Sequence, residues 1–398
     1  MRLSDKKRWT QLFRLPFLSA IVGVALTIIS ICLVLYKQQN TGERKQVAKK
    51  VNQSIPLAPV SRAPIRILLE EKNSYGNPSP INLSENIEQK KLAYNIAQPP
   101  KFIKSQKLQV IIDEVINLVK VKKLPLQPLS VTILNPKTGE YAGYKQKKLT
   151  YPASVVKLFW MVYLYAKIEQ NILSEADFTQ YLDSMIKKSD NEAASYIIDR
   201  FSQTQYQQNI TDKEYKNWLE KRLKINQYFQ QAGYDKINVS QKTFPIPSLK
   251  LSTAKGSELK MRGLPHLPIL NKISTQQVAR LLYEIYNRQS VSAIFSQKMA
   301  KLLTIDSTTR NLKKDDRNPN EFNPVRGFLS ASLPNNIHFR GKAGWTSNSR
   351  NDAAIIATSD GKIAYILVVF AEDKAYAHNW KIFPQISRLV FERMTNPK

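Results

Sequence analysis

The stretch "LTYPASVVKLFW", residues 149–160, places Ser154 three positions before Lys157 and at the start of a long apolar run. Residues three apart on a helix lie on the same face one turn away, so this spacing lets a lysine amine reach a serine hydroxyl. The same S-x-x-K spacing begins at Ser4, Ser154, Ser184, Ser252, Ser257 and Ser359. The spacing alone therefore does not identify a nucleophile, and the surrounding residues must decide.

The residues around Ser154 separate it from the other matches. Tyr151, Pro152 and Ala153 interrupt the chain, and the run "VVKLFWMVYLYA" then predicts a buried helix that begins near Ser154. A hydroxyl at that end lies beside unpaired N–H groups and the positive end of the helix dipole, which favour a developing oxyanion. An apolar surround would lower the pKa of Lys157 and make its amine a base. A helix-capping serine beside a solvated lysine remains the alternative at this stage.

The composition is strongly basic, with 60 Lys and Arg against 31 Asp and Glu and a formal net charge of +29. Such a charge suits nucleic acid, an anionic membrane surface or an anionic cell-wall polymer, and it also suits a merely solvated basic surface. No C-x-x-C pair, zinc-finger spacing or aromatic RNA-binding pattern is present in the sequence. Nucleic acid is therefore not expected as a partner.

An uncharged run, "PFLSAIVGVALTIISICLVLY", covers residues 16–36 and is long enough to cross a bilayer core as a helix. No cleavage site with small residues follows it, so we expect an uncleaved, single-pass membrane anchor. Basic residues flank the run on both sides, so the charge bias does not set its orientation. Cys32, the single cysteine, lies in this run and leaves no disulfide framework.

The composition divides the chain into four segments. Residues 1–15 are a basic tail, expected to be cytoplasmic, and residues 16–36 are the anchor. Residues 37–104 are rich in Pro, Gln, Lys and Ser without periodicity, which predicts a flexible spacer. Residues 105–398 show helical and strand periodicities, which predict a folded domain, the one that would carry any chemistry of Ser154 and Lys157.

The domain is predicted to be α+β. Strands are expected at 129–136 and 140–146, joined by a hairpin turn, and again at 337–345, 352–359 and 362–371. Helical periodicity or a capping residue predicts helices at about 108–121, 155–170, 175–187, 192–201, 213–231, 274–288, 292–304 and 378–394. Residues 234–272 form a long irregular segment, and such loops are usually functional. This order predicts an antiparallel sheet of N- and C-terminal strands packed with an all-helical subdomain.

A second motif, Ser189-Asp190-Asn191, falls at the junction of two predicted helices. A hydroxyl at such a junction can relay a proton, and an amide can hold a substrate amide. The same three residue types are also the favoured helix caps. The motif gains meaning only together with Ser154 and a third element further along the chain.

The third element is "KAG" at residues 342–344, on a predicted strand. A lysine there supplies positive potential to a pocket, and Gly344 allows close approach of the backbone. The more literal "KTG" at residues 137–139 precedes Ser154 and lies in a hairpin turn, so it is rejected. The order S-x-x-K, S-D-N, K-x-G resembles the signature of the penicillin-recognising serine enzymes, and from about Ser105 onward the chain is similar to class A β-lactamase-like serine hydrolases.

The resemblance implies a role for each motif residue. Ser154 would be the nucleophile that becomes acylated, and Lys157 would be its base or proton partner. Ser189 would pass a proton to the leaving nitrogen. Lys342 would supply the electrostatic attraction for the substrate.

The resemblance also implies the substrate contacts. Asn191 would hold the side-chain amide of the substrate. The backbone N–H groups of Ser154 and Trp345 would form the oxyanion hole, with Gly344 allowing the close approach. Arg350 resembles the arginine that such enzymes pair with the substrate carboxylate.

Two departures from the family bear on function. Ala343 stands where the family has Thr or Ser, so Thr346 or Ser347 is expected to supply the missing hydroxyl. The family's water-activating glutamate lies in an E-x-x-L-N motif, which this sequence lacks. Glu258, in "GSELKMRG", is the candidate for that catalytic base, and a solvated loop acid paired with a lysine is the alternative.

The expected function is that of a serine hydrolase that forms an acyl-enzyme on Ser154, with the β-lactam amide bond as its target. The alternatives are a D-Ala peptidase-like enzyme or esterase that acts on peptidoglycan stems or other acyl substrates with slow deacylation, and a non-catalytic wall-binding module. No G-x-S-x-G or H-E-x-x-H motif is present in the sequence. We therefore expect no Ser-His-Asp triad, no metal and no cofactor. Since these substrates lie outside the cytoplasm, we expect a monomer in the cytoplasmic membrane with its catalytic domain on the extracytoplasmic side.

Overall fold

The apolar run after Ser154 forms a helix that is buried on every side. The computed structural model describes residues 92–96, 98–311 and 322–396, and in it a 3₁₀ turn, η1 (Ala153–Val156), leads directly into α3 (Lys157–Glu169). Every residue of α3 from Lys157 to Ala166 is buried, which explains why its sequence shows no polar face. Ser154 therefore lies at the N-terminal end of a core helix.

A six-stranded sheet joins the two ends of the domain in the order β1-β3-β2-β6-β5-β4. The strands are β1 (Ile103–Lys104), β2 (Leu129–Leu134), β3 (Glu140–Tyr144), β4 (Ile337–Thr346), β5 (Ser349–Thr358) and β6 (Ala364–Ala371). All neighbours are antiparallel except the two-residue β1, which runs parallel to β3 and makes the sheet mixed. Because β2 pairs with β6, the N-terminal hairpin and the C-terminal strands share one sheet, and the α+β prediction is confirmed.

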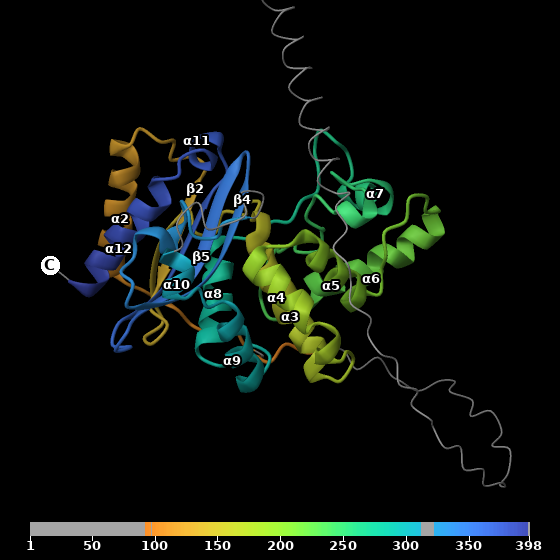
Figure 1. Ribbon diagram of the computed structural model, residues 1–398, viewed down its shortest axis with the longest axis horizontal. Helices are drawn as coiled ribbons and strands as arrows, with labels where there is room; N and C mark the ends of the chain where they lie inside the picture. The colour runs from red at the N-terminus through yellow and green to blue at the C-terminus, as the bar shows by residue number, and fades with distance from the viewer. Residues whose placement is uncertain (1–91, 97, 312–321, 397–398) are drawn as a thin grey trace, which may run out of the picture. The chain divides into compact units, whose positions relative to one another are not determined.

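The sheet separates two hydrophobic cores. Helices α2 (Gln106–Val121) and α12 (Ile382–Thr395) cover one face (Figure 1) and pack with strand residues such as Val131 and Leu367. The other face packs against α8 (Thr275–Tyr286), and this second core continues into α3 and the helical region around it. Alternate residues of one strand enter different cores, as strand geometry requires: Leu367 joins the first and Val368 the second.

The remaining helical elements surround α3 or cap the sheet. They are η2 (Glu175–Asp177), α4 (Thr179–Asp183), the π-turn η3 (Ser184–Lys188), α5 (Asn191–Ser202), α6 (Asp212–Gln230), η4 (Pro247–Leu249), α7 (Gly256–Arg262), α9 (Ala293–Leu302), α10 (Ser307–Asn311), η6 (Leu329–Ser332) and α11 (Lys374–Ala377). The helix expected over 175–187 is instead three short elements, because the chain widens into a π-turn before the S-D-N motif. Such π-turns are frequent at functional sites.

The anchor prediction for residues 16–36 lies outside the described residues, as does most of the predicted spacer. Within the described part of the chain, no helix is long and apolar enough to cross a membrane. The segment 234–272, expected to be irregular, contains η4 and α7. Isolated bridges join parts of this segment to one another, Asn238 with Lys272 and Ile246 with Leu251.

Candidate active site

The structure brings the three sequence motifs together in one chain of polar contacts. The Nζ of Lys157 lies 3.2 Å from the Oγ of Ser154 and 3.5 Å from the Oγ of Ser189. The Nζ of Lys342 donates to the same Ser189 hydroxyl at 2.9 Å. Two hydroxyls and two amines therefore alternate from Ser154 to Lys342, although they come from three distant parts of the sequence.

Local backbone geometry sets the position of each member. Side chains in a helix lean toward its N-terminus, so Lys157 in the first turn of α3 points back toward Ser154. Ser189 ends the π-turn with a left-handed φ of 58°, a conformation that non-glycine residues adopt at a cost and mostly at functional sites. Asn191 is the first residue of α5, whose N-terminus is capped by the side chain of Asp190.

Strand β4 passes directly over the turn that carries Ser154. A Cβ built on Gly344 would lie 2.8 Å from the backbone N of Ser154 and 2.9 Å from the backbone O of Pro152. Only glycine lets the strand approach this closely without moving the turn. Gly344 of "KAG" thus explains how β4 can approach the turn that carries Ser154.

Lys157 is completely buried and bonded only to uncharged oxygens. Its Nζ donates to the backbone O of Ser189 at 2.5 Å and to the Oδ1 of Asn191 at 2.8 Å, besides its contacts with the two hydroxyls. No carboxylate among the described residues contacts it. Burial, together with the nearby charge of Lys342, lowers the pKa of Lys157 well below its usual value, and the more distant charge of Asp190 opposes the shift.

Lys342 is buried in the same manner. Its Nζ donates to the backbone O of Ala343 at 2.9 Å as well as to Ser189. Burial lowers the pKa of Lys342 to about 7, against the opposing charge of Asp352. Asp352, on β5, accepts hydrogen bonds from the N–H groups of Leu329 and Ala353, and its own burial raises its pKa to about 7. The pKa values of both lysines are thus shifted in the direction that favours the neutral amine.

Thr243 belongs to the site, and sequence reasoning missed it. The Oδ1 of Asn191 accepts one hydrogen bond from Lys157 and a second, at 2.8 Å, from the Oγ1 of Thr243. Two donors on one oxygen fix the orientation of the amide, so its Nδ2 group is directed elsewhere and binds no other described residue. The only signal for Thr243 in the sequence was its place in the unusually long segment 234–272.

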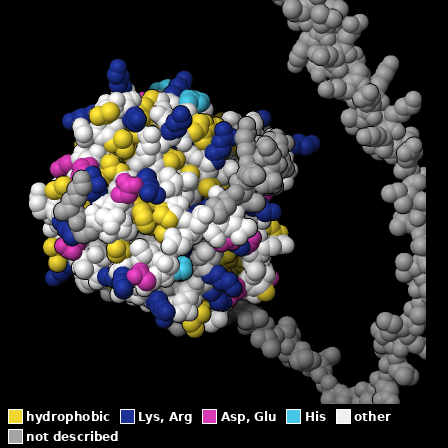
Figure 2. Space-filling model, turned by 60° about the vertical axis from the view of Figure 1, so that its left-hand side comes forward, with side chains coloured by type: hydrophobic (Ala, Val, Ile, Leu, Met, Phe, Trp, Pro, Cys, Tyr) yellow, Lys and Arg dark blue, Asp and Glu magenta, His cyan; other side chains and the backbone are white. Residues whose placement is uncertain are grey.

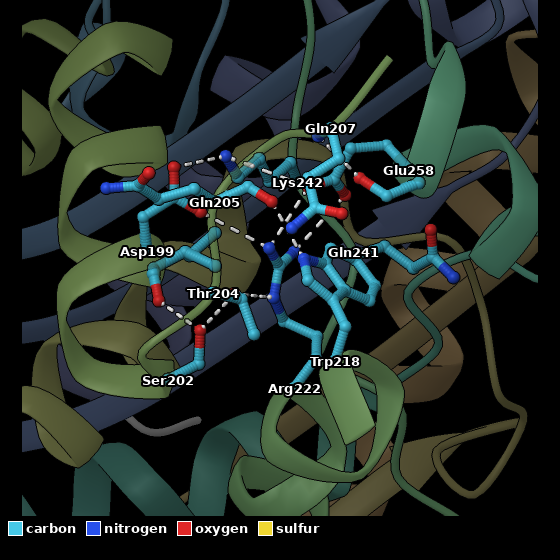
Figure 3. A network of polar contacts seen from close by, with 12 residues as sticks. Asp199, Ser202, Thr204, Gln205, Gln207, Trp218, Arg222, Gln241, Lys242 and Glu258 are labelled. Carbon is cyan, nitrogen blue, oxygen red and sulfur yellow. Dashed lines mark hydrogen bonds and ion pairs between the residues drawn. The ribbon is translucent and has the colours of Figure 1, made fainter. Parts of the chain in front are cut away.

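Glu258, the candidate for the water-activating base, lies in a different cluster (Figure 3). Its carboxylate receives two hydrogen bonds from Arg222, at 3.0 and 3.2 Å, and lies 3.7 Å from the Nζ of Lys242. Asp199 binds the same two cations, at 3.3 and 2.7 Å. Glu258 is 1% exposed, so it is not the solvated loop acid of the alternative interpretation either. Among the described contacts, none joins Glu258 to Ser154 or Lys157.

Arg350, expected to pair with a substrate carboxylate, is directed into the protein instead. Its guanidinium donates to the backbone oxygens of Tyr376, Gly327 and Ala377 at 3.0, 3.0 and 2.7 Å. It is also fully buried and lies 4.2 Å from the centre of the Trp380 ring. These contacts tie Arg350 to α11 and to the turn at Gly327, and they do not support a role in substrate binding.

The other predicted substrate contacts lie at the turn between β4 and β5. Thr346 and Ser349 share a hydrogen bond of 2.8 Å between their hydroxyls. Trp345 is 38% exposed, and its indole N–H donates to the backbone O of Ala377. A hydroxyl is therefore present on β4, four residues beyond Lys342, where Ala343 supplies none.

Comparison with known protein families finds one match that covers more than half of the chain. Residues 173–394 match the family described as the beta-lactamase enzyme family, Beta-lactamase2. The matched region contains Ser189, Asn191 and Lys342 and begins after Ser154, which therefore lies outside the match. No curated protein sequence matches this chain.

Solved structures support the same fold at low sequence identity. A PBP-A mutant in an acyl-enzyme complex with penicillin G is 16% identical, with a TM-score of 0.50 and coverage of 74% of this chain and 99% of that one. The TLA-3 extended-spectrum beta-lactamase is 14% identical, with a TM-score of 0.50 and coverage of 73% and 100%. A beta-lactamase from Sphaerobacter thermophilus is 16% identical, with a TM-score of 0.49 and coverage of 71% and 97%. The first two show a class A beta-lactamase-like fold.

Proposed function

Because the chain belongs to the beta-lactamase enzyme family, we propose that it is a serine hydrolase that forms an acyl-enzyme on Ser154, with β-lactams as its substrates. The observation that carries the proposal is the unbroken contact chain from Ser154 through Lys157 and Ser189 to Lys342. It links a nucleophile to a buried amine without a counter-charge, which is the arrangement that activates a hydroxyl at neutral pH.

Acylation follows from this arrangement. The neutral amine of Lys157 takes the proton from the Oγ of Ser154, and the oxygen attacks the carbonyl carbon of the substrate amide. The oxyanion is held by the backbone N–H groups of Ser154 and Trp345, which the close approach of β4 to the turn brings near one another. The proton then passes from Lys157 by way of the Ser189 hydroxyl to the leaving nitrogen as the C–N bond breaks.

Substrate positioning uses the groups around that chain. The Nδ2 of Asn191 donates to a carbonyl on the substrate side chain, because its Oδ1 is already held by Lys157 and Thr243. Lys342 attracts a substrate carboxylate while it carries its proton. The Thr346 hydroxyl supplies the contact that Ala343 lacks. Arg350 has no part in this proposal, since its donors are used by main-chain oxygens.

The second candidate is an acyl-enzyme-forming protein with slow deacylation, acting on peptidoglycan stems or other acyl substrates. The ion-pair cluster of Glu258 favours it, because that carboxylate is bound by Arg222 and Lys242 rather than directed at Ser154. A carboxylate held by two cations is a weak base for activating water. In either case we propose that residues 16–36 anchor the protein in the cytoplasmic membrane with its catalytic domain outside the cytoplasm.

One experiment separates the candidates. The full-length protein is mixed with a chromogenic cephalosporin while absorbance and intact mass are followed together, with Ser154→Ala as the control. Steady hydrolysis supports the β-lactamase, and a long-lived adduct that is absent from Ser154→Ala supports the slow-deacylation candidate. If the wild-type protein shows neither hydrolysis nor an adduct, the proposed function is wrong.

A further inference from the structure

A cavity of about 420 Å³ opens behind the S-D-N turn, between α4, the π-turn and α5. We name it the α4–α5 cavity. Its walls include Tyr181, Asp190, Glu192, Ser195, Tyr196 and Asp199. Ser154, Lys157, Ser189 and Lys342 do not line it, so it is distinct from the site of acylation although it adjoins Asn191.

The charge of this cavity is opposite to that of the protein. Asp190, Glu192 and Asp199 line it, and no Lys or Arg does. Two other cavities, of about 200 and 350 Å³, are lined by four and three Lys or Arg side chains respectively, in a chain of net charge +29. Figure 2 shows the same excess of basic side chains over the face in view. An acidic, cation-free cavity is therefore an exception on this surface.

Two of the three carboxylates lack a counter-ion among the described residues. Asp199 is balanced by Arg222 and Lys242. Asp190 instead accepts only the N–H of Glu192, and Glu192 accepts only the N–H and hydroxyl of Ser248. These donors are neutral, so neither carboxylate has a cation in contact, although the more distant Lys157 interacts with the charge of Asp190.

The remaining walls suit an organic group. The rings of Tyr181 and Tyr196 stack with centroids 3.9 Å apart, and Leu249, also on the wall, is 36% exposed. Ser195 lines the cavity and is only 5% exposed. Its hydroxyl makes no hydrogen bond to any described residue. The oxygen of Ser195 is not among the fully buried side-chain atoms that lack a partner, so it is open to the cavity and can accept a hydrogen bond from a ligand.

We propose that the α4–α5 cavity binds a small organic cation of the alkylammonium class. The ammonium would donate to the carboxylates of Asp190 and Glu192 and to the hydroxyl of Ser195, which matches its three donors. The tyrosine rings and Leu249 would cover the alkyl chain, and aromatic faces also attract cations. A bare metal ion fits less well, since no cluster of three His, Cys, Asp or Glu ligands is present in the described residues.

The test uses the full-length protein and n-butylammonium chloride, followed by calorimetry at constant ionic strength. Saturable one-to-one binding is expected for butylammonium, and none for butanol or butyrate, which keep the chain and lose the positive charge. Glu192→Gln removes one uncompensated charge and is expected to weaken binding about tenfold. Glu220→Gln, an exposed residue of α6 outside the cavity, is the matched control and should bind as the wild type does.

A second variant guards against loss of folding. Ser195→Lys places an ammonium on the cavity wall itself, so it should abolish butylammonium binding while the melting temperature is maintained or rises. The proposal is overturned if the wild type shows no saturable binding, or if Glu192→Gln and Ser195→Lys both bind like the wild type. Acylation kinetics then identify the source of the cation. If butylammonium slows acylation by β-lactams with a cationic side chain, but not by benzylpenicillin, the cavity binds the cationic side chain of the substrate. If acylation rates are the same with and without butylammonium, the cavity binds a free amine.

Discussion

Two clusters in this fold bury two cationic side chains each, and they differ in whether a carboxylate contacts the cations. In the ion-pair cluster (Asp199, Arg222, Lys242 and Glu258; Figure 3), both cations contact carboxylates. In the candidate catalytic cluster (Ser154, Lys157, Ser189 and Lys342), both amines donate hydrogen bonds only to hydroxyl, amide and carbonyl oxygens. All four cations are at most 2% exposed, so the counter-charge, and not burial, is the difference.

The presence or absence of a carboxylate separates a structural role for a buried cation from a chemical one. A buried cation with a carboxylate keeps its proton, and the pair holds distant elements together, because breaking it leaves an uncompensated charge. A buried amine without a carboxylate has a lowered pKa, because burial disfavours its charged form. The neutral amine can then act as a base. We therefore expect replacement of a lysine to affect the acylation rate in one cluster and the free energy of unfolding in the other.

The largest expected effect on chemistry is that of Lys157→Met. Removing the base should slow acylation of Ser154 by about 10² to 10⁴-fold. The free energy of unfolding should not fall, because the variant replaces a buried amine without a counter-charge by an apolar chain of similar length. Intact-mass kinetics with a β-lactam and denaturant unfolding measure the two quantities. Acylation at the wild-type rate would show that Lys157 is only a structural residue.

The opposite outcome is expected for Lys242→Met in the ion-pair cluster. The change leaves Asp199 and Glu258 with one cation fewer, and breaking a buried pair lowers the free energy of unfolding by about 3–5 kcal/mol. The folded fraction should still acylate on Ser154, because Lys242 makes no contact with the nucleophile.

Glu258→Gln extends this test to the proposed water-activating role. Since Arg222 and Lys242 bind that carboxylate, the variant should also lose stability and should not accumulate acyl-enzyme beyond the wild-type level. A stable Glu258→Gln protein that traps the acyl-enzyme would move Glu258 from the ion-pair cluster to the catalytic one.

The sequence was sufficient to predict the fold, and it singled out Ser154, Lys157, Ser189 and Lys342, which the structure places in contact with one another. The periodicities of the strands and helices, and the order of Ser154, Ser189 and Lys342, depend on local sequence signals that survive without an alignment. The partners of Glu258 and Arg350 could not be predicted, because they depend on contacts across the fold. Arg222 is 36 residues from Glu258, and the backbone oxygens that bind Arg350 come from α11 and from the turn at Gly327.

The lowered pKa of Lys342 predicts how the acylation rate depends on pH. A lysine is charged below its pKa and neutral above it, so Lys342, with a pKa lowered to about 7, loses its positive charge as the pH rises through neutrality. The acylation rate with an anionic β-lactam should therefore fall, by about tenfold, between pH 6 and pH 8, while a neutral ester substrate should lack this decline. Parallel profiles for the two substrates would show that Lys342 does not attract the substrate carboxylate.

The smallest effect is expected at Thr243, where the two clusters meet. Lys242 fixes this loop through Asp199, and the next residue, Thr243, orients the amide of Asn191, which also binds Lys157. Thr243→Val keeps the shape and removes the hydroxyl, and one hydrogen bond of this kind corresponds to about a threefold to tenfold change. If the substrate's side-chain amide binds Asn191 as proposed, the loss should appear in acylation by benzylpenicillin and should be smaller for 6-aminopenicillanic acid, which has no such amide.

Thr243→Ser is the matched control, since it retains the hydroxyl and should restore the rate with benzylpenicillin. A merely structural role for Thr243 would reduce the rates with both penicillins equally and would lower stability in step. A selective loss with benzylpenicillin, at unchanged stability, would instead mean that the ion-pair cluster influences the chemistry by way of one hydroxyl. The two clusters would then be coupled, with the charged pair positioning the loop and the uncharged contacts leaving the amine free to act.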